Sequence, residues 1–192
     1  MVPSDGAVPE DDALLARYAG GDLEAARMLM DRHAGRCLSL ARRMLRDETE
    51  AEDIAQEAML RLWKIAPDWR SGEAKVSTWL YRVTSNLCTD RLRRARRQMV
   101  DLDQTAEPAD DGPSVQARME AGERVAALHQ AIAALPERQR LAVQLRHLDE
   151  MSNIEIAEIM GTSVEAVESL LARARRALAA ALAGRKAEIG FG

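Results

Sequence analysis

A short segment in the C-terminal third of the chain constrains the fold most, because it carries start and stop signals for two consecutive helices. Ser152 and Glu155 match the capping box S-x-x-E, in which each side chain binds an unpaired amide of the first helical turn. Gly161 suits the left-handed residue that ends a helix. Thr162 and Glu165 then repeat the capping box, so a second helix is predicted to begin at once.

The link between these two predicted helices is short and contains a glycine, which sets helices at a steep angle, as in a helix-turn-helix. In that arrangement the second helix can enter the major groove of DNA. The second helix ends in a basic cluster, Arg173, Arg175 and Arg176. The alternative interpretation is an ordinary helical hairpin with a solvated face, since short hairpins of this kind are common.

The composition favours an all-α fold. The chain has 192 residues, which allows one large domain or two small ones. Hydrophobic residues make up 47% of it, enough for a core, whereas aromatic residues make up only 3%. Ala, Leu, Arg and Glu dominate, and runs of strand-forming residues are absent, so helices are favoured.

Segments that would take the chain into or across a membrane are not apparent. The sequence has no apolar stretch of about 18 residues, so no transmembrane helix is predicted. The first residues lack the basic start and apolar core of a signal peptide. These features predict a cytoplasmic protein.

The cysteines and histidines do not form a recognisable site. Cys37 and Cys88 are isolated at apolar helical positions, which predicts buried, reduced thiols. The histidines at 33, 129 and 147 are scattered, and no Ser/His/Asp set, glycine-rich phosphate loop or HExxH motif is visible. We therefore predict no catalytic residue, no metal site and no cofactor, and a protein that is not an enzyme.

The charges are distributed unevenly along the chain. The net charge is −4, yet residues 82–97 are strongly basic and residues 101–111 strongly acidic. The acidic stretch also contains Pro and Gly and has little to bury, as in a flexible linker. The predicted organisation is a helical domain at 1–97, an acidic linker at 98–120 and a second helical domain at 121–192.

Hydrophobic periodicity and capping signals predict helices besides the two described above, at about 22–46, 47–66, 75–97 and 114–135, and one from Pro136 onward. Asp22 is predicted to cap the first of these, and the capping-box pattern Asp47 to Glu50 opens the second. The helix from Pro136 carries four apolar positions, Leu141, Val143, Leu145 and Leu148.

The helix predicted at 75–97 combines aromatic and arginine side chains. Trp79 and Tyr81 lie near its start, and the polar residues that follow are Asn86, Asp90, Arg91, Arg93 and Arg94. Aromatic rings can stack on unpaired bases and arginines can hold phosphates, so this helix is predicted to capture an opened DNA strand. The alternative is that Trp79 belongs to the core and the arginines only form a solvated face.

The helix opening at Asp47 has an acidic face made of Glu52, Asp53, Gln56 and Glu57. Like charges at a spacing of four residues are mildly destabilising, so the cluster indicates a basic partner surface. Surface solubility is the alternative explanation.

In combination, these features resemble the small bacterial sigma factors of the extracytoplasmic-function (ECF) type, which are members of the sigma-70 family. The resemblance covers about residues 12–183, with the acidic linker outside its motifs. The matching stretches are 53–63 (DIAQEAMLRLW), 77–94 (STWLYRVTSNLCTDRLRR), 135–141 (LPERQRL), 154–161 (IEIAEIMG) and 172–176 (ARARR).

The resemblance implies a promoter-specificity subunit of RNA polymerase, with a region 2 domain and a region 4 domain. Asp53, Gln56 and Glu57 would dock on the β′ clamp helices, and region 4 would dock on the β flap. The −10 promoter element would be recognised and opened by the loop 69–73 and by the polar and aromatic residues of the helix at 75–97. The linker would run through the RNA exit path, and an anti-sigma factor would restrain the protein.

The second helix of the C-terminal motif would read the −35 element. The residues assigned to this role are Thr162, Ser163, Glu165, Glu168, Ser169, Arg173, Arg175 and Arg176. Many relatives carry basic residues where this chain has Glu168 and Leu170, so two expected contacts are missing. Glu168 can instead accept a hydrogen bond from cytosine N4.

Two other functions remain open at this point. One is a sigma mimic that sequesters an anti-sigma factor and binds no promoter, which the negative net charge and Glu168 favour. The other is a helix-turn-helix repressor, which lacks an evident ligand or dimerisation domain and leaves residues 47–97 unexplained.

Overall fold

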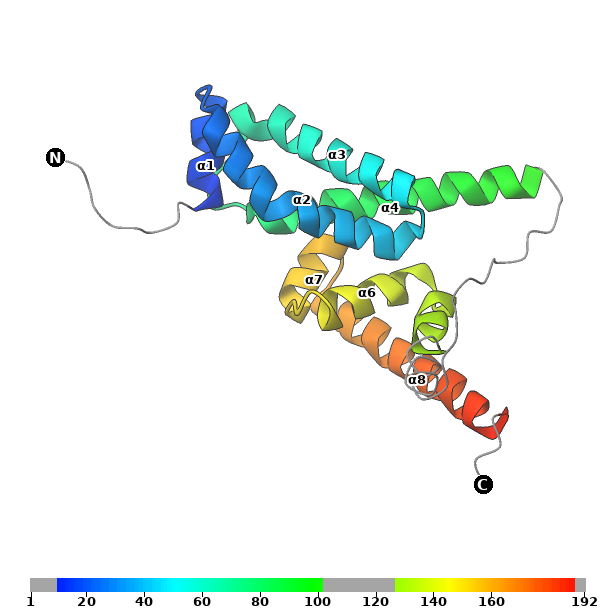
Figure 1. The fold of residues 1–192 in the computed structure, drawn as a ribbon. Coiled ribbons are helices and arrows are strands. Elements are labelled where there is room, and N and C mark those ends of the chain that lie inside the picture. The colour runs from blue at the N-terminus through cyan, green and yellow to red at the C-terminus, as the bar shows by residue number, and fades with distance from the viewer. Residues whose placement is uncertain (1–9, 102–126, 189–192) are drawn as a thin grey trace, which may run out of the picture. The chain divides into compact units, whose positions relative to one another are not determined.

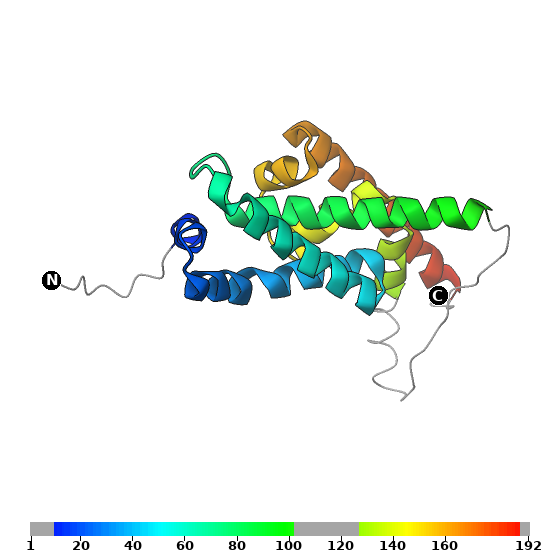
Figure 2. The same ribbon diagram turned by 90° about the horizontal axis from the view of Figure 1, so that it is seen from above.

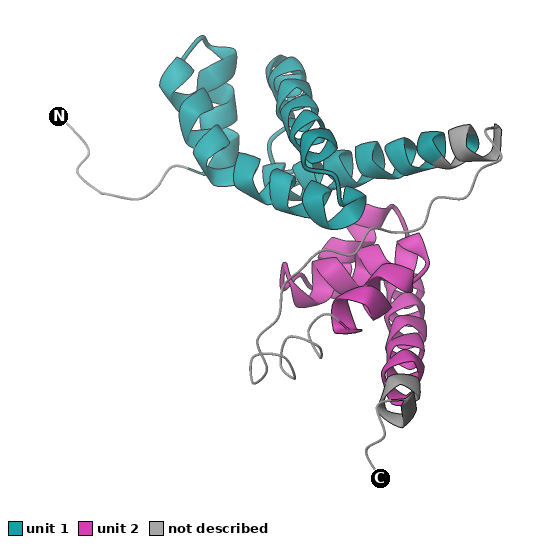
Figure 3. Cartoon of the chain, turned by 45° about the vertical axis from the view of Figure 1, so that its right-hand side comes forward, with its two compact units in different colours: residues 1–102 teal, residues 103–192 magenta. Residues whose placement is uncertain are grey.

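The computed structural model describes residues 10–101 and 127–188. The chain forms two compact units, Met1–Leu102 and Asp103–Gly192 (Figure 3). Every element in the described parts of the chain is a helix, which confirms the predicted all-α class. Within those parts, no helix is both long and apolar enough to cross a membrane.

Unit 1 is a bundle of three long helices with a short helix at one end (Figures 1 and 2). Its elements are α1 (Asp11–Ala19), α2 (Leu23–Leu45), α3 (Glu48–Ile65), the 3-10 turn η1 (Ala66–Asp68) and α4 (Val76–Asp101). Helix α2 packs against α1, α3 and α4, and α1 also contacts η1. The last turns of α4 extend past α2 and α3 (Figure 1).

The core of unit 1 follows the apolar periodicity of the sequence. Its fully buried side chains include Leu14, Leu29, Leu40, Leu62 and Leu80. Each buried leucine contributes roughly 1.5–3 kcal/mol relative to exposure, so this core holds the bundle together.

The helix starts of unit 1 were mostly predicted from local signals. Asp22 caps α2 by accepting hydrogen bonds from the amides of Glu24 and Ala25, at 3.0 and 3.2 Å. Asp47 caps α3 by accepting from the amide of Glu50, at 2.9 Å. Only this half of the capping box is used, because the Glu50 carboxylate accepts instead from the Arg91 guanidinium of α4.

Other predictions in unit 1 were correct with shifted ends. Helix α4 runs to Asp101, beyond the predicted end at Arg97, so the first residues assigned to the linker are helical. The rest of that linker, 102–120, lies outside the described residues. Cys37 and Cys88 are buried thiols outside any disulfide, as predicted, and burial raises the pKa of Cys37.

Unit 2 contains a helix at 127–134, followed by α6 (Glu137–His147), α7 (Asn153–Met160) and α8 (Val164–Glu188). The part of the predicted 114–135 helix before residue 127 lies outside the described residues. Helix α8 packs against α6 and α7. The buried side chains at this junction include Leu145, Ile156, Ile159 and Val167. Leu148, an apolar position of the predicted helix, is instead 59% exposed.

Candidate nucleic-acid interface and docking surface

The turn between α7 and α8 has the conformation that the sequence predicts. Ser152 Oγ accepts from the Glu155 amide at 3.3 Å, and Glu155 Oε2 accepts from the Ser152 amide at 3.0 Å, which completes the capping box. Gly161 ends α7 with φ of 57°. Glycine adopts a left-handed backbone conformation at the lowest free-energy cost, so any residue with a side chain would strain the turn at this position.

The start of α8 differs from the prediction by one residue. The cap is Ser163 rather than Thr162, because Ser163 Oγ accepts from the Ala166 amide at 3.2 Å and α8 begins at Val164. The Thr162 amide is already used to close α7, where it donates to the Ala157 carbonyl at 3.0 Å. Together with the bond from the Gly161 amide to Glu158, this is a Schellman motif, which makes Thr162 part of the preceding helix end.

The predicted −35 residues lie mainly on the exposed side of α8. Val167, Leu171 and Ala174 are buried, so the opposite side of the helix is presented to solvent. The exposed members of the set are Ser163, Glu165, Glu168, Arg173, Arg175 and Arg176, and the half-buried members are Thr162 and Ser169. Hydrogen bonds from its own amide and from the Ser163 hydroxyl lower the pKa of the Glu165 carboxyl.

Helix α4 separates its buried and exposed sides with the same regularity. Leu80, Thr84 and Cys88 are buried, and Thr84 Oγ1 donates back to the Leu80 carbonyl at 2.8 Å. The exposed residues at helical spacing are Arg82, Asn86, Asp90, Arg93, Arg94 and Arg97. Four of the predicted −10 residues, Asn86, Asp90, Arg93 and Arg94, therefore lie on an accessible and largely basic face.

Arg91 has a second role that the sequence did not reveal. Its guanidinium is paired with Glu50 in the first turn of α3, and this hydrogen bond raises the pKa of Arg91. The pair joins two helices across 41 residues of sequence. Arg91 is thus a structural link as well as a member of the predicted DNA-binding set.

The aromatic residues of α4 do not both face solvent. Tyr81 is only 6% exposed, so the expectation that its ring is offered to an unpaired base is wrong in this structure. Trp79 is half-buried and packs against the core of unit 1, as the alternative interpretation held. Its ring meets that of Trp69 edge to face, with the centroids 6.0 Å apart.

The acidic face of α3 is accessible. Glu52, Asp53 and Gln56 are exposed, and Glu57 is half-exposed. Glu57 accepts from Arg61 at 2.8 Å, one helical turn away, and this bond lowers the pKa of Glu57. The arginine offsets part of the like-charge repulsion expected from the sequence.

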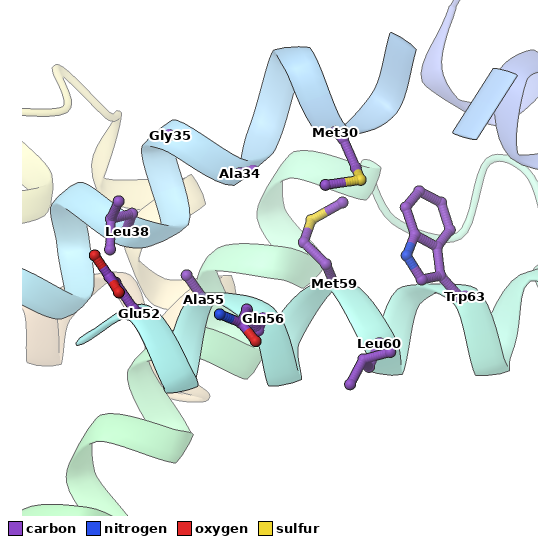
Figure 4. A pocket seen from close by; sticks show the side chains of 10 residues that line it. All are labelled: Met30, Ala34, Gly35, Leu38, Glu52, Ala55, Gln56, Met59, Leu60 and Trp63. Carbon is purple, nitrogen blue, oxygen red and sulfur yellow. The ribbon is translucent and has the colours of Figure 1, made fainter. Parts of the chain in front are cut away.

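A groove of about 540 Å³ runs between α2 and α3 beside this acidic face. Helix α2 contributes Met30, Ala34, Gly35 and Leu38, and α3 contributes Glu52, Ala55, Gln56, Met59, Leu60 and Trp63 (Figure 4). Met30 and Met59 point toward one another across it. Met30 is 47% and Leu60 52% exposed, so apolar surface is left open to a partner.

Sequence reasoning missed this groove, although one signal was present. Met30 and Leu60 are apolar residues next to the core-facing positions of their helices, and apolar residues in such places indicate a second apolar face. Flexible methionine side chains also suit an adaptable binding surface.

Among the described residues, no three His, Cys, Asp or Glu side chains are grouped as metal ligands.

The structure thus has two helical units, one with an apolar groove and an exposed basic face on α4, and one with a helix-turn-helix. Comparison with known families gives the same division. Residues 29–98 match the model for Sigma-70 region 2, and residues 126–178 match the model for Sigma-70, region 4. The first match covers the groove and most of α4, and the second covers the helix-turn-helix.

Similar proteins extend the match to most of the chain. The RNA polymerase sigma-H factor of Pseudomonas aeruginosa is 34% identical over 182 residues, covering 90% of this chain and 94% of that protein. The ECF RNA polymerase sigma factor SigM of Mycobacterium tuberculosis is 36% identical over 169 residues, covering 88% and 83%. The chain belongs to the sigma-70 family and to its ECF type, whose members are promoter-specificity subunits of bacterial RNA polymerase.

Solved structures share the fold. CnrH, in complex with the cytosolic domain of CnrY, has a TM-score of 0.67 and 27% identity, covering 91% of this chain and 97% of that one. The sigma factor RpoE of Bartonella quintana, in complex with the anti-sigma factor NepR, has a TM-score of 0.64 and 20% identity, covering 81% and 95%.

Proposed function

We propose that this chain brings RNA polymerase to promoters through three of its surfaces. The α2/α3 groove with its acidic rim binds core polymerase, the exposed face of α4 acts on the −10 element, and α8 reads the −35 element. The observation that carries the proposal is the pairing, in one chain, of a helix-turn-helix with a solvent-facing α8 and a second unit whose α4 exposes arginines beside Asn86 and Asp90.

The groove supports a partner that is an amphipathic helix with basic flanks. Most of its lining residues are apolar, whereas Glu52 and Gln56 are the polar ones, and the exposed Asp53 follows Glu52 on α3. Apolar side chains in the groove supply binding energy, and complementary charges at the rim set orientation and association rate. The β′ clamp helices of core polymerase are the partner that the family implies, and Asp53, Gln56 and Glu57 are the contacts that we assign.

The exposed face of α4 suits separated strands better than intact duplex. Arg93 and Arg94 can hold phosphates, and Asn86 and Asp90 can bond to base edges, which strand opening makes accessible. Trp79 supports the neighbouring loop 69–73 through its ring contact with Trp69, and it is half-buried. The buried Tyr81 acts through packing.

The −35 surface combines local anion binding with base contacts. Ser163 at the start of α8 lies where helix amides attract a phosphate. Glu168 and Arg173 are exposed and can reach base edges in the major groove. Leu148 and Ile154, 59% and 63% exposed, give unit 2 an apolar contact for the β flap.

We also propose that an anti-sigma factor restrains the protein, that it has no catalytic activity of its own, and that it acts in the cytoplasm, where RNA polymerase works. The likeness to CnrH in its complex with CnrY supports the first point. The sequence, which offers no candidate catalytic set, supports the second.

Run-off transcription with purified core polymerase tests the proposal. Promoter sequences enriched after overexpression serve as templates, and transcripts should appear only when this chain is added. A sigma mimic that only sequesters an anti-sigma factor would bind that partner but give no transcript from any template.

A further inference from the structure

Two neighbouring aspartates at the start of α1 hold different parts of unit 1. Asp11 faces α2, where Oδ1 accepts from Arg32 Nη1 at 2.8 Å and Oδ2 lies 2.7 Å from His33 Nε2. His33 is only 4% exposed, so this contact anchors α1 on the bundle. Asp12 is therefore presented from a fixed position.

Asp12 is bonded to the loop that connects η1 to α4. Its Oδ1 accepts from the indole Nε1 of Trp69 at 3.0 Å, and its Oδ2 accepts from the amide of Gly72 at 3.2 Å. Gly72 has a φ of 87°, the left-handed conformation that favours glycine. One carboxylate thus fixes both the first side chain of the loop and the backbone at its turn.

The bonds within the loop itself are weak. Residues 70–73 are exposed, and Glu73 is joined to Arg70 by a long contact from its amide to the Arg70 carbonyl, at 3.4 Å, and by an exposed ion pair. Exposed ion pairs of this kind contribute little to conformational stability. Trp69, in contrast, links the loop to α4, because its ring packs on that of Trp79.

We propose that Asp12 is a positioning residue for −10 recognition, which holds the loop 69–73 and, through Trp69, the start of α4 in the geometry that reads the −10 bases. This inference rests on the proposed function of the loop. A binding loop discriminates between bases only when its backbone is held in one geometry by supporting contacts. Removing the carboxylate lets the loop sample other conformations, and the cost appears in base discrimination rather than in binding of core polymerase.

The test uses the full chain with core polymerase and two promoter libraries, one randomised at −10 and one at −35. The variants are Asp12→Ala, Asp12→Asn, which keeps one acceptor oxygen, and Trp69→Phe, which removes the indole donor together with part of the ring that packs on Trp79. Glu10→Gln is the matched control, because Glu10 is an exposed carboxylate at the same helix end and its side chain makes no cap hydrogen bond.

Discrimination at −10 is measured as transcription from the best −10 element divided by transcription from elements that differ from it by one base. We expect Asp12→Ala to reduce this ratio by about three- to tenfold, the range for loss of such hydrogen bonds. Asp12→Asn and Trp69→Phe should show smaller reductions of the same kind. The −35 preference and core binding should stay unchanged in all variants, as should every property of Glu10→Gln. Amide exchange at Gly72, followed by NMR, should accelerate in both Asp12 variants.

Equal loss of transcription from all −10 sequences, in step with loss of folded protein in thermal melts, would show a merely structural residue and overturn the inference. Unchanged −10 discrimination in folded Asp12→Ala and Asp12→Asn would overturn it as well, while leaving the proposed function intact. A wild-type chain that shows no −10 dependence would overturn both together.

Discussion

The surface of unit 2 that we propose for −35 recognition and the surfaces of unit 1 are built in different ways. In unit 2 the capping box, the Schellman turn and the exposed face of α8 all come from residues 152–176, which are neighbours in sequence. In unit 1 the groove joins α2 to α3, Arg91 is tied to Glu50, and Asp12 holds a loop 57 residues away at Trp69. A site of the first kind keeps its shape from local signals, whereas one of the second kind depends on tertiary packing.

The largest effect is expected at the docking surface that we propose for unit 1. Asp53→Arg together with Glu57→Arg should abolish holoenzyme assembly, because removing one partner of a desolvated charge pair costs roughly 2–5 kcal/mol. The domain should stay folded, because Asp53 is exposed, Glu57 is half-exposed, and the pair between Glu57 and Arg61 is a surface pair of the kind that contributes little to stability.

Size-exclusion chromatography with core polymerase measures this assembly. Glu10→Arg with Glu24→Arg is the control, because it makes the same change in charge at exposed positions that lie outside α3 and its acidic face. Assembly by the folded Asp53/Glu57 variant would refute the docking assignment, and equal loss in the control would reduce it to a net-charge effect.

In unit 2, Glu168→Lys should change which −35 bases are preferred. An exposed glutamate that accepts from cytosine N4 contributes roughly 1–3 kcal/mol of discrimination, which the lysine loses. A −35 promoter library assayed with both proteins measures the preference. Identical sequence preferences with uniformly higher affinity would make Glu168 a solvent-facing residue only.

The arginines of α4 should divide into two groups. Arg93→Ala and Arg94→Ala should each weaken DNA binding across all sequences and reduce the salt slope by about one unit per lost phosphate contact. Arg91→Ala should instead loosen the α3–α4 contact and lower the melting temperature of unit 1, because it removes the pair with Glu50. Equal salt slopes for all three variants would show that Arg91 contacts phosphate as Arg93 and Arg94 do, and would refute its separate structural role.

The start of α8 offers a test at the level of a single hydrogen bond. Ser163→Ala should destabilise unit 2 by about 1 kcal/mol, the usual cost of losing a cap. Thr162→Ala should cost far less, because only the Thr162 backbone takes part in the turn. Urea unfolding measures the free energy of unfolding of the two variants. A larger decrease for Thr162→Ala would show that Thr162 is the cap, as the sequence predicted.

The smallest effect concerns pH and the anchor of α1. Burial lowers the pKa of His33 below its ordinary value of 6.5, although Asp11 opposes the shift and Arg32 and Arg36 add to it. The stability contributed by the neutral imidazole is therefore fully present above that pH and is lost as the pH falls through the folded-state pKa. Between about pH 7 and pH 5, the melting temperature should fall less steeply for His33→Gln than for wild type.

His147→Gln, at an exposed position of unit 2, is the control and should match the wild type. A His33→Gln profile equal to that of the wild type would refute the role of His33.

The sequence by itself determined the all-α class, the helix-turn-helix with its positive-φ Gly161, the cap at Asp22 and the exposed polar face of α4. These features follow from hydrogen bonds and side-chain spacings within one or two helical turns, which a linear pattern records directly. The one-residue shift at Ser163 arose because Thr162 matches the cap pattern equally well, and only the Schellman turn decides between them.

The tertiary structure alone decided the burial of Tyr81, the pairing of Arg91 with Glu50, the α2/α3 groove and the hold of Asp12 on Trp69 and Gly72. Each of these joins residues on different elements, and no local spacing encodes which helix face will meet another. The rotation and offset of packed helices follow from how all their side chains interdigitate, so the same arginine can reach solvent or a carboxylate depending on its neighbours across the bundle.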